Sequence, residues 1–213
     1  AETGMESRDD DMTYVGTALN TNLDPPRARG QARLSLKPGP GGGAIEALRT
    51  EGSLKLVFPR PSGQAFDAVL VNTAGGITGG DRFSTEAEAG PGTALSLTTQ
   101  AAERAYRATG DTPGKVNTAL RVAGGGRLTW LPQETILFDG ANLSRRLSVQ
   151  MAAEATFLMV EPLVLGRAAM GEEVTSARFH DRVEIHRAGV PLWFDGVRLE
   201  GNLAAQMART ALG

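Results

Sequence analysis

The chain has 213 residues, of which 41% are hydrophobic and 22% charged, and its formal net charge is −2 at pH 7. This composition predicts one folded domain, and a near-neutral charge without a basic stripe argues against nucleic acid as a partner. The absence of cysteine excludes disulfides, thiolate catalysis and cysteine-ligated zinc. Since no leader and no long apolar run is present either, the cytoplasm is the expected compartment and no membrane contact is expected.

In chain order, residues 1–29 are polar and are expected to form a flexible segment before a β-rich domain over residues 30–213. Short segments of alternating or continuous apolar character then recur, and Gly, Pro, Asn or Asp bounds each of them, as is typical of strands. The expected strands are 32–37, 54–58, 68–73, 83–89, 94–99, 118–123, 127–131, 145–151, 182–187 and 191–195. The predicted fold class is mainly β, a single domain of stacked short strands (sandwich or β-helix-like) with one or two helices.

Three other segments carry separate expectations. Residues 37–52 are rich in Gly and Pro and predict a mobile hairpin loop or linker. Residues 156–166 are apolar on both faces and predict the most buried pair of strands. Asn202 is a suitable N-cap for a helix over 202–212, whereas 99–107 is too short to decide between a helix and another structure.

The segment 72–81, "NTAGGITGGD", places two glycine pairs before a carboxylate. A Walker loop would need Lys and Ser or Thr where Asp81 and Arg82 stand, so phosphate binding is disfavoured. The glycine pairs predict turns between two strands. They do not explain why the turn ends in an acid.

Other acids lie in apolar surroundings: Glu103, Glu134, Glu161 and Asp195. A buried carboxylate costs several kcal/mol unless it is paired, protonated or in contact with water. Each could simply form an ion pair with a nearby arginine. Together they could also line a buried aqueous passage for cations.

Two alternatives come from other classes of protein. An all-β hydrolase could use Glu161 and Asp195 as an acid–base pair about 5–10 Å apart, although aromatic residues are scarce. The chain could also be a β interaction module with no role in ion handling. His180 and His186 would stand about 20 Å apart in one strand, too far to chelate one ion, and are expected on the surface. Any cation would therefore meet oxygen ligands, which bind divalent transition metals loosely.

Four segments now carry a resemblance to a known family. "NTAGGITGGD" (72–81), "TTQAAERAYR" (98–107), "WLPQETILFDGA" (130–141) and "EPLVLGRAAMGE" (161–172) resemble the signature blocks of UreD, also called UreH, the urease accessory proteins. The blocks occur in family order, and the similarity covers about residues 30 to 212.

The resemblance implies a β-rich, helix-like stack of strands with two helices, and a scaffold chaperone rather than an enzyme. It implies binding to apo-urease and, through UreF, recruitment of the GTPase UreG in a heterocomplex that could dimerise through UreF. Nickel released by UreG would pass through UreF and a water-filled tunnel to the urease active site. No cofactor would be bound permanently, and nickel would be present only in transit.

By position, the resemblance implies a nickel path along Asp81, Glu161 and Asp195, with Glu134 at a further acidic position. A tunnel role for Glu103 is less secure because some relatives have a small polar residue in that block. Members of the family usually continue beyond "MARTALG", so partner contacts made by that continuation are in question. The exposed side of the helix 202–212, with Leu203 and Met207, and the nearby strands are expected to contribute to the UreF surface.

Overall fold

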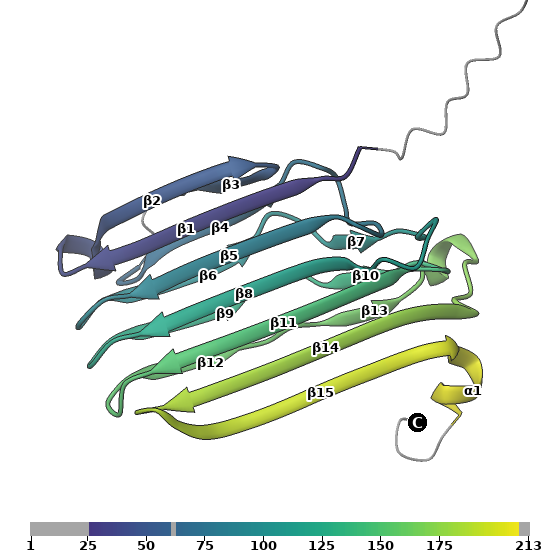
Figure 1. The fold of residues 1–213 in the computed structure, drawn as a ribbon. Helices are drawn as coiled ribbons and strands as arrows, with labels where there is room; N and C mark the ends of the chain where they lie inside the picture. Colours follow the sequence, from purple (N-terminus) through teal and green to yellow (C-terminus); the bar gives the residue numbers. More distant parts are fainter. Residues whose placement is uncertain (1–25, 61–62, 209–213) are drawn as a thin grey trace, which may run out of the picture.

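The computed structural model describes residues 26–60 and 63–208, and the chain forms three sheets there (Figure 1). The long sheet consists, in spatial order, of β15 (Val190–Asn202), β14 (Ser176–Arg187), β11 (Asn142–Met151), β8 (Gly114–Val122), β5 (Arg82–Ala89), β1 (Arg29–Lys37) and β2 (Ala44–Gly52). Its inner strands are parallel, and β2 and β15 close its two ends as antiparallel neighbours.

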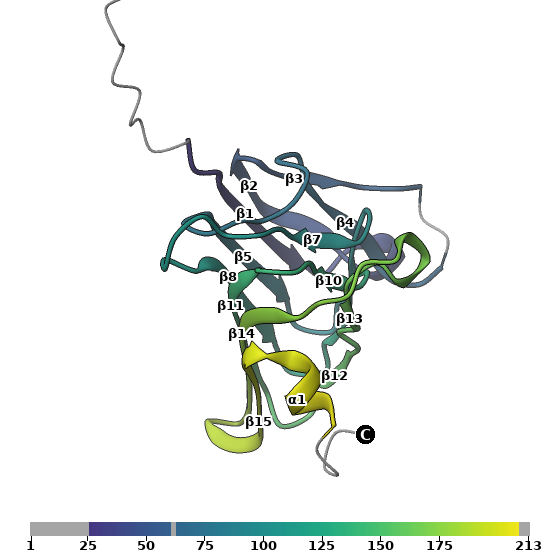
Figure 2. The same ribbon diagram turned by 90° about the vertical axis from the view of Figure 1, so that its right-hand side faces the viewer.

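Two smaller sheets lie beside the long one, as Figure 2 shows from the side. The five-stranded sheet consists of β12 (Thr156–Met159), β9 (Arg127–Leu131), β6 (Ala94–Thr99), β4 (Phe66–Asn72) and β3 (Leu54–Val57). The three-stranded sheet consists of β13 (Leu163–Leu165), β10 (Thr135–Leu137) and β7 (Glu103–Ala105). Two short 3-10 turns, η1 (Pro40–Gly42) and η2 (Ala168–Met170), and the helix α1 (Leu203–Met207) complete the elements.

The strands are wound as a solenoid. Each of three successive coils, β5-β6-β7, β8-β9-β10 and β11-β12-β13, contributes one strand to each sheet, and each strand pairs in parallel with its equivalent in the next coil. The prediction of a mainly β, stacked-strand fold is therefore confirmed. Within the described residues no helix has the length and apolar character needed to cross a bilayer.

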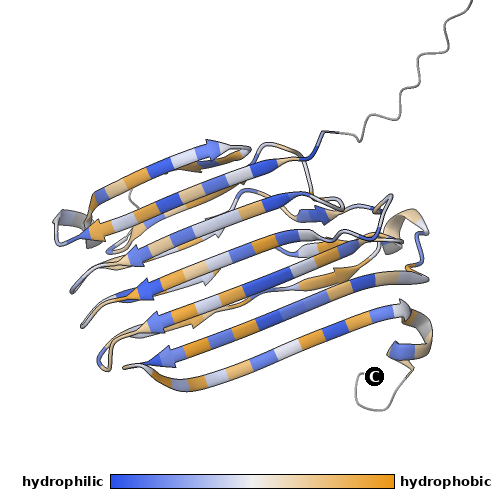
Figure 3. Cartoon of the chain, in the orientation of Figure 1, coloured by the Kyte–Doolittle hydropathy of each residue, from blue (hydrophilic) through white to orange (hydrophobic). Residues whose placement is uncertain are grey.

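The core follows from the two-residue period of the strands, which sends alternate side chains inward. In β5 every second residue is buried, and the hydropathy colouring of Figure 3 shows the same alternation along the long sheet. Register stacks the inward residues of successive coils on each other, as in the row Leu34, Ala87, Leu120 and Val149. These stacked rows form one continuous hydrophobic core.

Two expectations about local structure were wrong. Most of 37–52 is not a loop, because β2 occupies Ala44–Gly52 and pairs with β1 from Gly30 to Lys37. The pair expected to be most buried, 156–166, instead forms β12 and β13, each at the edge of its sheet. Leu158 and Val164 are exposed because they occupy the outward-facing positions of these strands, and Val160, between the two strands, is exposed as well.

The segment 99–107 contains a strand, β7, and not a helix. The C-terminal helix begins as expected: the Asn202 side chain accepts a hydrogen bond from the Ala205 amide at 3.0 Å. It is described as a helix over Leu203–Met207, and residues 209–213 lie outside the described part, as do residues 1–25 of the expected N-terminal segment.

Candidate functional site

The glycine segment 72–81 pairs with β7, the edge strand of the three-stranded sheet, through a parallel bridge between Ile77 and Ala105. The Ile77 amide donates to the Arg104 carbonyl, and the Tyr106 amide donates to the Ile77 carbonyl, both at 2.8 Å. A side chain at Gly76 could not fit, because its Cβ would lie 2.3 Å from the Tyr106 ring. The glycines therefore allow the turn to dock directly on β7.

Asp81 holds this turn in place. Its Oδ2 accepts a hydrogen bond from the Thr78 amide and its Oδ1 one from the Ala28 amide, each at 2.8 Å. The side chain is buried. The acid that ends the glycine segment thus joins the turn to the start of β1, which explains structurally why a carboxylate stands there.

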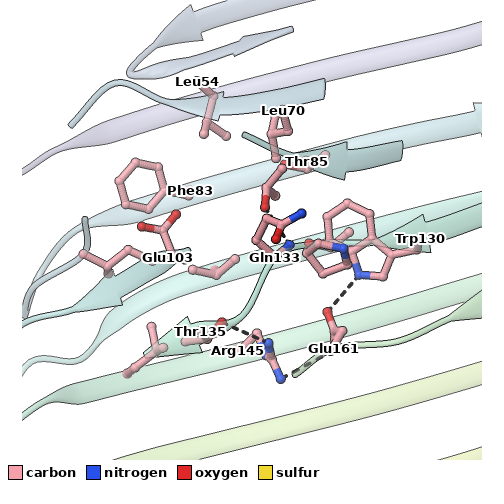
Figure 4. A pocket seen from close by; sticks show the side chains of 16 residues that line it. Leu54, Leu70, Phe83, Thr85, Glu103, Trp130, Gln133, Thr135, Arg145 and Glu161 are labelled. Carbon is pink, nitrogen blue, oxygen red and sulfur yellow. Dashed lines mark hydrogen bonds and ion pairs between the residues drawn. The ribbon is translucent and has the colours of Figure 1, made fainter. Parts of the chain in front are cut away.

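A pocket with a largely apolar wall and several polar side chains, here called the central pocket, lies between the three sheets beside this turn (Figure 4). Its cavity has a volume of about 70 Å³, and a buried water needs roughly 10–15 Å³ of such space, so several waters fit. Most of its wall is apolar and includes leucine, isoleucine, valine and phenylalanine side chains. The polar part of the lining consists of Thr85, Thr99, Glu103, Thr118, Trp130, Gln133, Thr135, Arg145 and Glu161.

Glu103 lies between the central pocket and a second cavity of about 120 Å³, here called the turn pocket, and lines both. The Asn72 side-chain amide donates to both Glu103 carboxylate oxygens, at 3.2 and 3.1 Å. Burial raises the pKa of Glu103 above its ordinary value, although the hydrogen bonds from Asn72 and the charge of Arg104 oppose this rise. The turn pocket is also lined by exposed Gly75 and Gln100, so it reaches the surface.

Glu161 lies in the corner between β12 and β13, and its side chain is only 7% exposed. Its Oε1 accepts a hydrogen bond from the Trp130 indole at 2.8 Å. Its Oε2 accepts no hydrogen bond from the described residues and lies 3.5 Å from the Arg145 guanidinium. Burial raises the pKa of Glu161, and the charge of Arg145 and the indole hydrogen bond reduce the rise.

Arg145 is itself committed to another acid. Its Nε donates to Asp181 Oδ1 at 3.0 Å, a second guanidinium nitrogen contacts Asp181 Oδ2, and a third donates to Thr135 Oγ1 at 3.3 Å. Burial alone would lower the pKa of Arg145, but the hydrogen bonds to Asp181 and the charges of Glu161 and Asp181 outweigh it and raise the pKa. The arginine therefore stays charged inside the fold.

Arg145 and Asp181 were not among the candidate residues from the sequence. The available signal was the two-residue period of β11. It places Arg145 on the same inward face as the buried Leu143, Leu147 and Val149. Its partner could not be deduced, because Asp181 lies 36 residues away and becomes a direct neighbour only through the parallel register of β11 and β14.

The structure does not bring the four expected path acids together. Glu161 lines the central pocket, whereas Asp81 is enclosed in its turn. Glu134 is half-buried beside β10 and does not line either pocket. Asp195 is exposed on β15, where it accepts a hydrogen bond from the adjacent Gly196 amide. Glu103 is the acid that shares the pocket with Glu161.

The hydrolase alternative requires Glu161 and Asp195 in one site, and only Glu161 lines the central pocket. Of the histidines, His180 is exposed on β14, where it contacts Glu200, and His186 is half-buried. Within residues 26–60 and 63–208 no three His, Asp or Glu side chains are grouped so that they could hold a metal ion. The pocket thus offers separate carboxylates instead of a chelating site.

The two residues expected at a partner surface differ in their environment. Leu203 is 1% exposed and belongs to the core, whereas Met207 is 41% exposed. The edge strand β15 also exposes apolar side chains, here called the β15 surface, and most of them lie toward its first end, away from α1 (Figure 1): Val190, Leu192, Trp193, Phe194 and Val197. An apolar group of this kind is typical of a protein-binding surface.

Comparison with known proteins gives concordant matches. A family model described as UreD urease accessory protein matches residues 28–213. The chain is 50% identical over 192 residues to the urease accessory protein UreD of Roseobacter denitrificans, covering 90% of this chain and 70% of that protein. It is 55% identical over 166 residues to that of Ruegeria pomeroyi (78% and 65%), and 46% identical over 196 residues to that of Rhizobium rhizogenes (92% and 71%). The matched part thus spans roughly two thirds of the length of these relatives.

Proposed function

Since this chain belongs to the family of UreD urease accessory proteins, we propose that it conducts nickel ions past its buried carboxylates to apo-urease, as a scaffold that works with UreF and the GTPase UreG. The family places the chain in urease maturation, in an accessory role. Nickel is cargo in this proposal and no cofactor is held permanently. The expected cytoplasmic location stays a prediction.

The observation that carries the proposal is a pair of carboxylates inside a β-solenoid, in two cavities that share a wall. In this proposal a cation would enter at the turn pocket, meet Glu103, which lines both cavities, and then reach Glu161 in the central pocket. Thr135, the neighbour of Glu103 in the next coil, also lines the central pocket. Of the acids expected on the path, Glu161 is therefore the one that we retain in this route.

The chemistry of the donors suits transit. A conduit must bind an ion well enough to admit it and weakly enough to release it. Carboxylate and hydroxyl oxygens bind divalent transition metals less tightly than clustered imidazoles or thiolates do. The chain has no cysteine, and neither His180 nor His186 lines the two pockets.

We expect Glu161→Gln and Glu103→Gln each to lower the nickel content of urease about tenfold, since each change removes one of the two negative charges that would attract the cation along this route. The measurement is the nickel content of urease purified from cells that co-express the variant with urease, UreF and UreG. Glu134→Gln and Asp195→Asn are the matched controls outside the two pockets, and each is expected to leave the nickel content unchanged.

Full nickel loading by both pocket variants, with intact complexes in a pull-down, would contradict this route. Loss of loading by Asp195→Asn alone would instead indicate a path that reaches β15. Loss of complex formation would indicate that the glutamates act on assembly.

We also propose that the exposed side of α1 and the β15 surface both contact UreF. Trp193 and Phe194 are 58% and 64% exposed, and Arg182 stacks on the Phe194 ring at 5.0 Å. Exposed aromatic residues with an adjacent arginine are the composition that protein interfaces favour.

Met207→Arg is expected to weaken the complex with UreF about tenfold, because a charge would replace an exposed apolar side chain on α1, the helix that follows β15. Co-purification with UreF or titration by light scattering would measure it. Met170→Arg is the matched control, since Met170 is 74% exposed and lies on η2, outside α1 and β15. Unchanged binding by Met207→Arg would remove α1 from the interface.

The interaction module without an ion role remains the second candidate, and the β15 surface is the observation that favours it. It would be supported if Met207→Arg impaired urease activation while both pocket glutamate variants loaded nickel normally.

A further inference from the structure

Three buried charges lie at one side of the central pocket: Arg145 and Glu161 line it, and Asp181 lies behind Arg145. Side-chain exposure is 11% for Arg145, 11% for Asp181 and 7% for Glu161. The guanidinium is bound by two of its nitrogens to Asp181, whereas it reaches Glu161 only at 3.5 Å and without a hydrogen bond. One arginine therefore interacts with two carboxylates, and its interaction with Glu161 is the weaker of the two.

The stacking of the solenoid places the arginine there. Along the inward row of the long sheet, Phe83 is followed by Val116, then by Arg145, and then by Asp181. The first three of these residues line the central pocket. The charged guanidinium thus occupies a position that is taken by apolar side chains, Phe83 and Val116, in the two preceding coils.

A divalent cation that approached Glu161 would meet a positive charge already in place. The free Oε2, which accepts no hydrogen bond from the described residues, is the oxygen nearest the guanidinium. An opposite charge within about 4–6 Å changes the proton affinity of a carboxylate by 1–3 pKa units, that is by about 10- to 1,000-fold. A divalent cation that competes for the same oxygen is affected in the same direction.

We propose that Arg145, anchored by Asp181, is a resident counter-cation that keeps the Glu161 carboxylate from holding a divalent metal ion tightly. This inference rests on the proposed function in that it assumes Glu161 to be on the cation route. Arg145 tunes the residence time of the ion, and Asp181 is a positioning residue that keeps the guanidinium beside Glu161. The Arg145–Asp181 pair would thus let a metal ion dissociate from Glu161 quickly, so that the pocket does not retain it.

The test removes the ion pair as a unit. In Arg145→Met/Asp181→Asn the two changes cancel in charge, so Glu161 is left without its counter-cation and no additional carboxylate is uncompensated. Binding of Ni²⁺ alone is measured by equilibrium dialysis on the chain prepared without a histidine tag. We expect the dissociation constant to fall at least about tenfold relative to the unmodified chain.

Two further variants separate the cause. Adding Glu161→Gln to the double variant is expected to abolish the gain in Ni²⁺ affinity. This distinguishes binding at Glu161 from background binding to surface histidines. Arg145→Lys keeps the positive charge and is expected to bind Ni²⁺ as weakly as the unmodified chain. Circular dichroism and thermal unfolding confirm that each variant is folded before dialysis.

The outcomes are distinguishable. A folded double variant that binds Ni²⁺ no more tightly than the unmodified chain, or a gain that persists with Glu161→Gln, would overturn the inference. Either result leaves the route through Glu161 to be judged by the nickel content of urease in the single Glu161→Gln variant. If the inference holds, the double variant should also load urease more slowly than the unmodified chain, because it retains the ion.

Discussion

Asp81→Ala is expected to lower the free energy of unfolding by about 3–5 kcal/mol. The change removes the acceptor of two backbone amides, those of Thr78 and Ala28, in a turn that is enclosed by the start of β1 and by β7. A hydrogen bond to a charged group is worth about 1.5–3 kcal/mol, and an amide left buried and unpaired costs about 1–3 kcal/mol. Urea unfolding followed by circular dichroism measures the change.

Two controls test the explanation. Asp81→Asn keeps one acceptor oxygen and is expected to lose about half as much stability. Asp195→Ala removes an exposed carboxylate and is expected to stay within about 0.5 kcal/mol of the unmodified chain. If Asp81→Ala unfolded like the unmodified chain yet left urease without nickel, Asp81 would belong to the ion path and the turn would be held by other contacts.

Arg145→Met is expected to destabilise the fold by about 3–5 kcal/mol, the usual effect of removing one partner from a buried ion pair. The change leaves Asp181 and Glu161 without a counter-charge. The neighbouring Arg146 is the matched control: its side chain is 53% exposed and pairs with Glu184 at 2.9 Å. Arg146→Met is expected to cost less than about 1 kcal/mol.

The loss in Arg145→Met should depend on pH with a definite sign. Burial already raises the pKa of Glu161, and Arg145 opposes that rise, so removing Arg145 raises the pKa further. A carboxylate whose pKa is raised on folding favours the folded state at low pH, and this stabilisation is lost as the pH rises above its ordinary value of 4.5. The destabilisation should therefore be smaller at pH 4 than at pH 7. An equal loss at both values would indicate that lost packing, and not charge, is the cause.

The sequence was sufficient for features that depend on neighbouring residues. Alternation at period two located β6 and β9 at the residues where they occur, since the period sets which side chains face inward. Gly76 and Gly80 were expected in turns and have positive φ values of 150° and 87°. Asn202 was expected as an N-cap and has that role, because a cap needs only the next three residues.

The tertiary structure alone decided which side chains meet. Alternation gives the face of a strand but not its neighbour, so β2 and the exposed edge strands β12 and β13 could not be placed in advance. Register brings Asp181 against Arg145, and winding of the chain brings the Ala28 amide to Asp81 across 53 residues. The site depends on these contacts because a buried charge is defined by its partners, and those partners come from other coils of the solenoid.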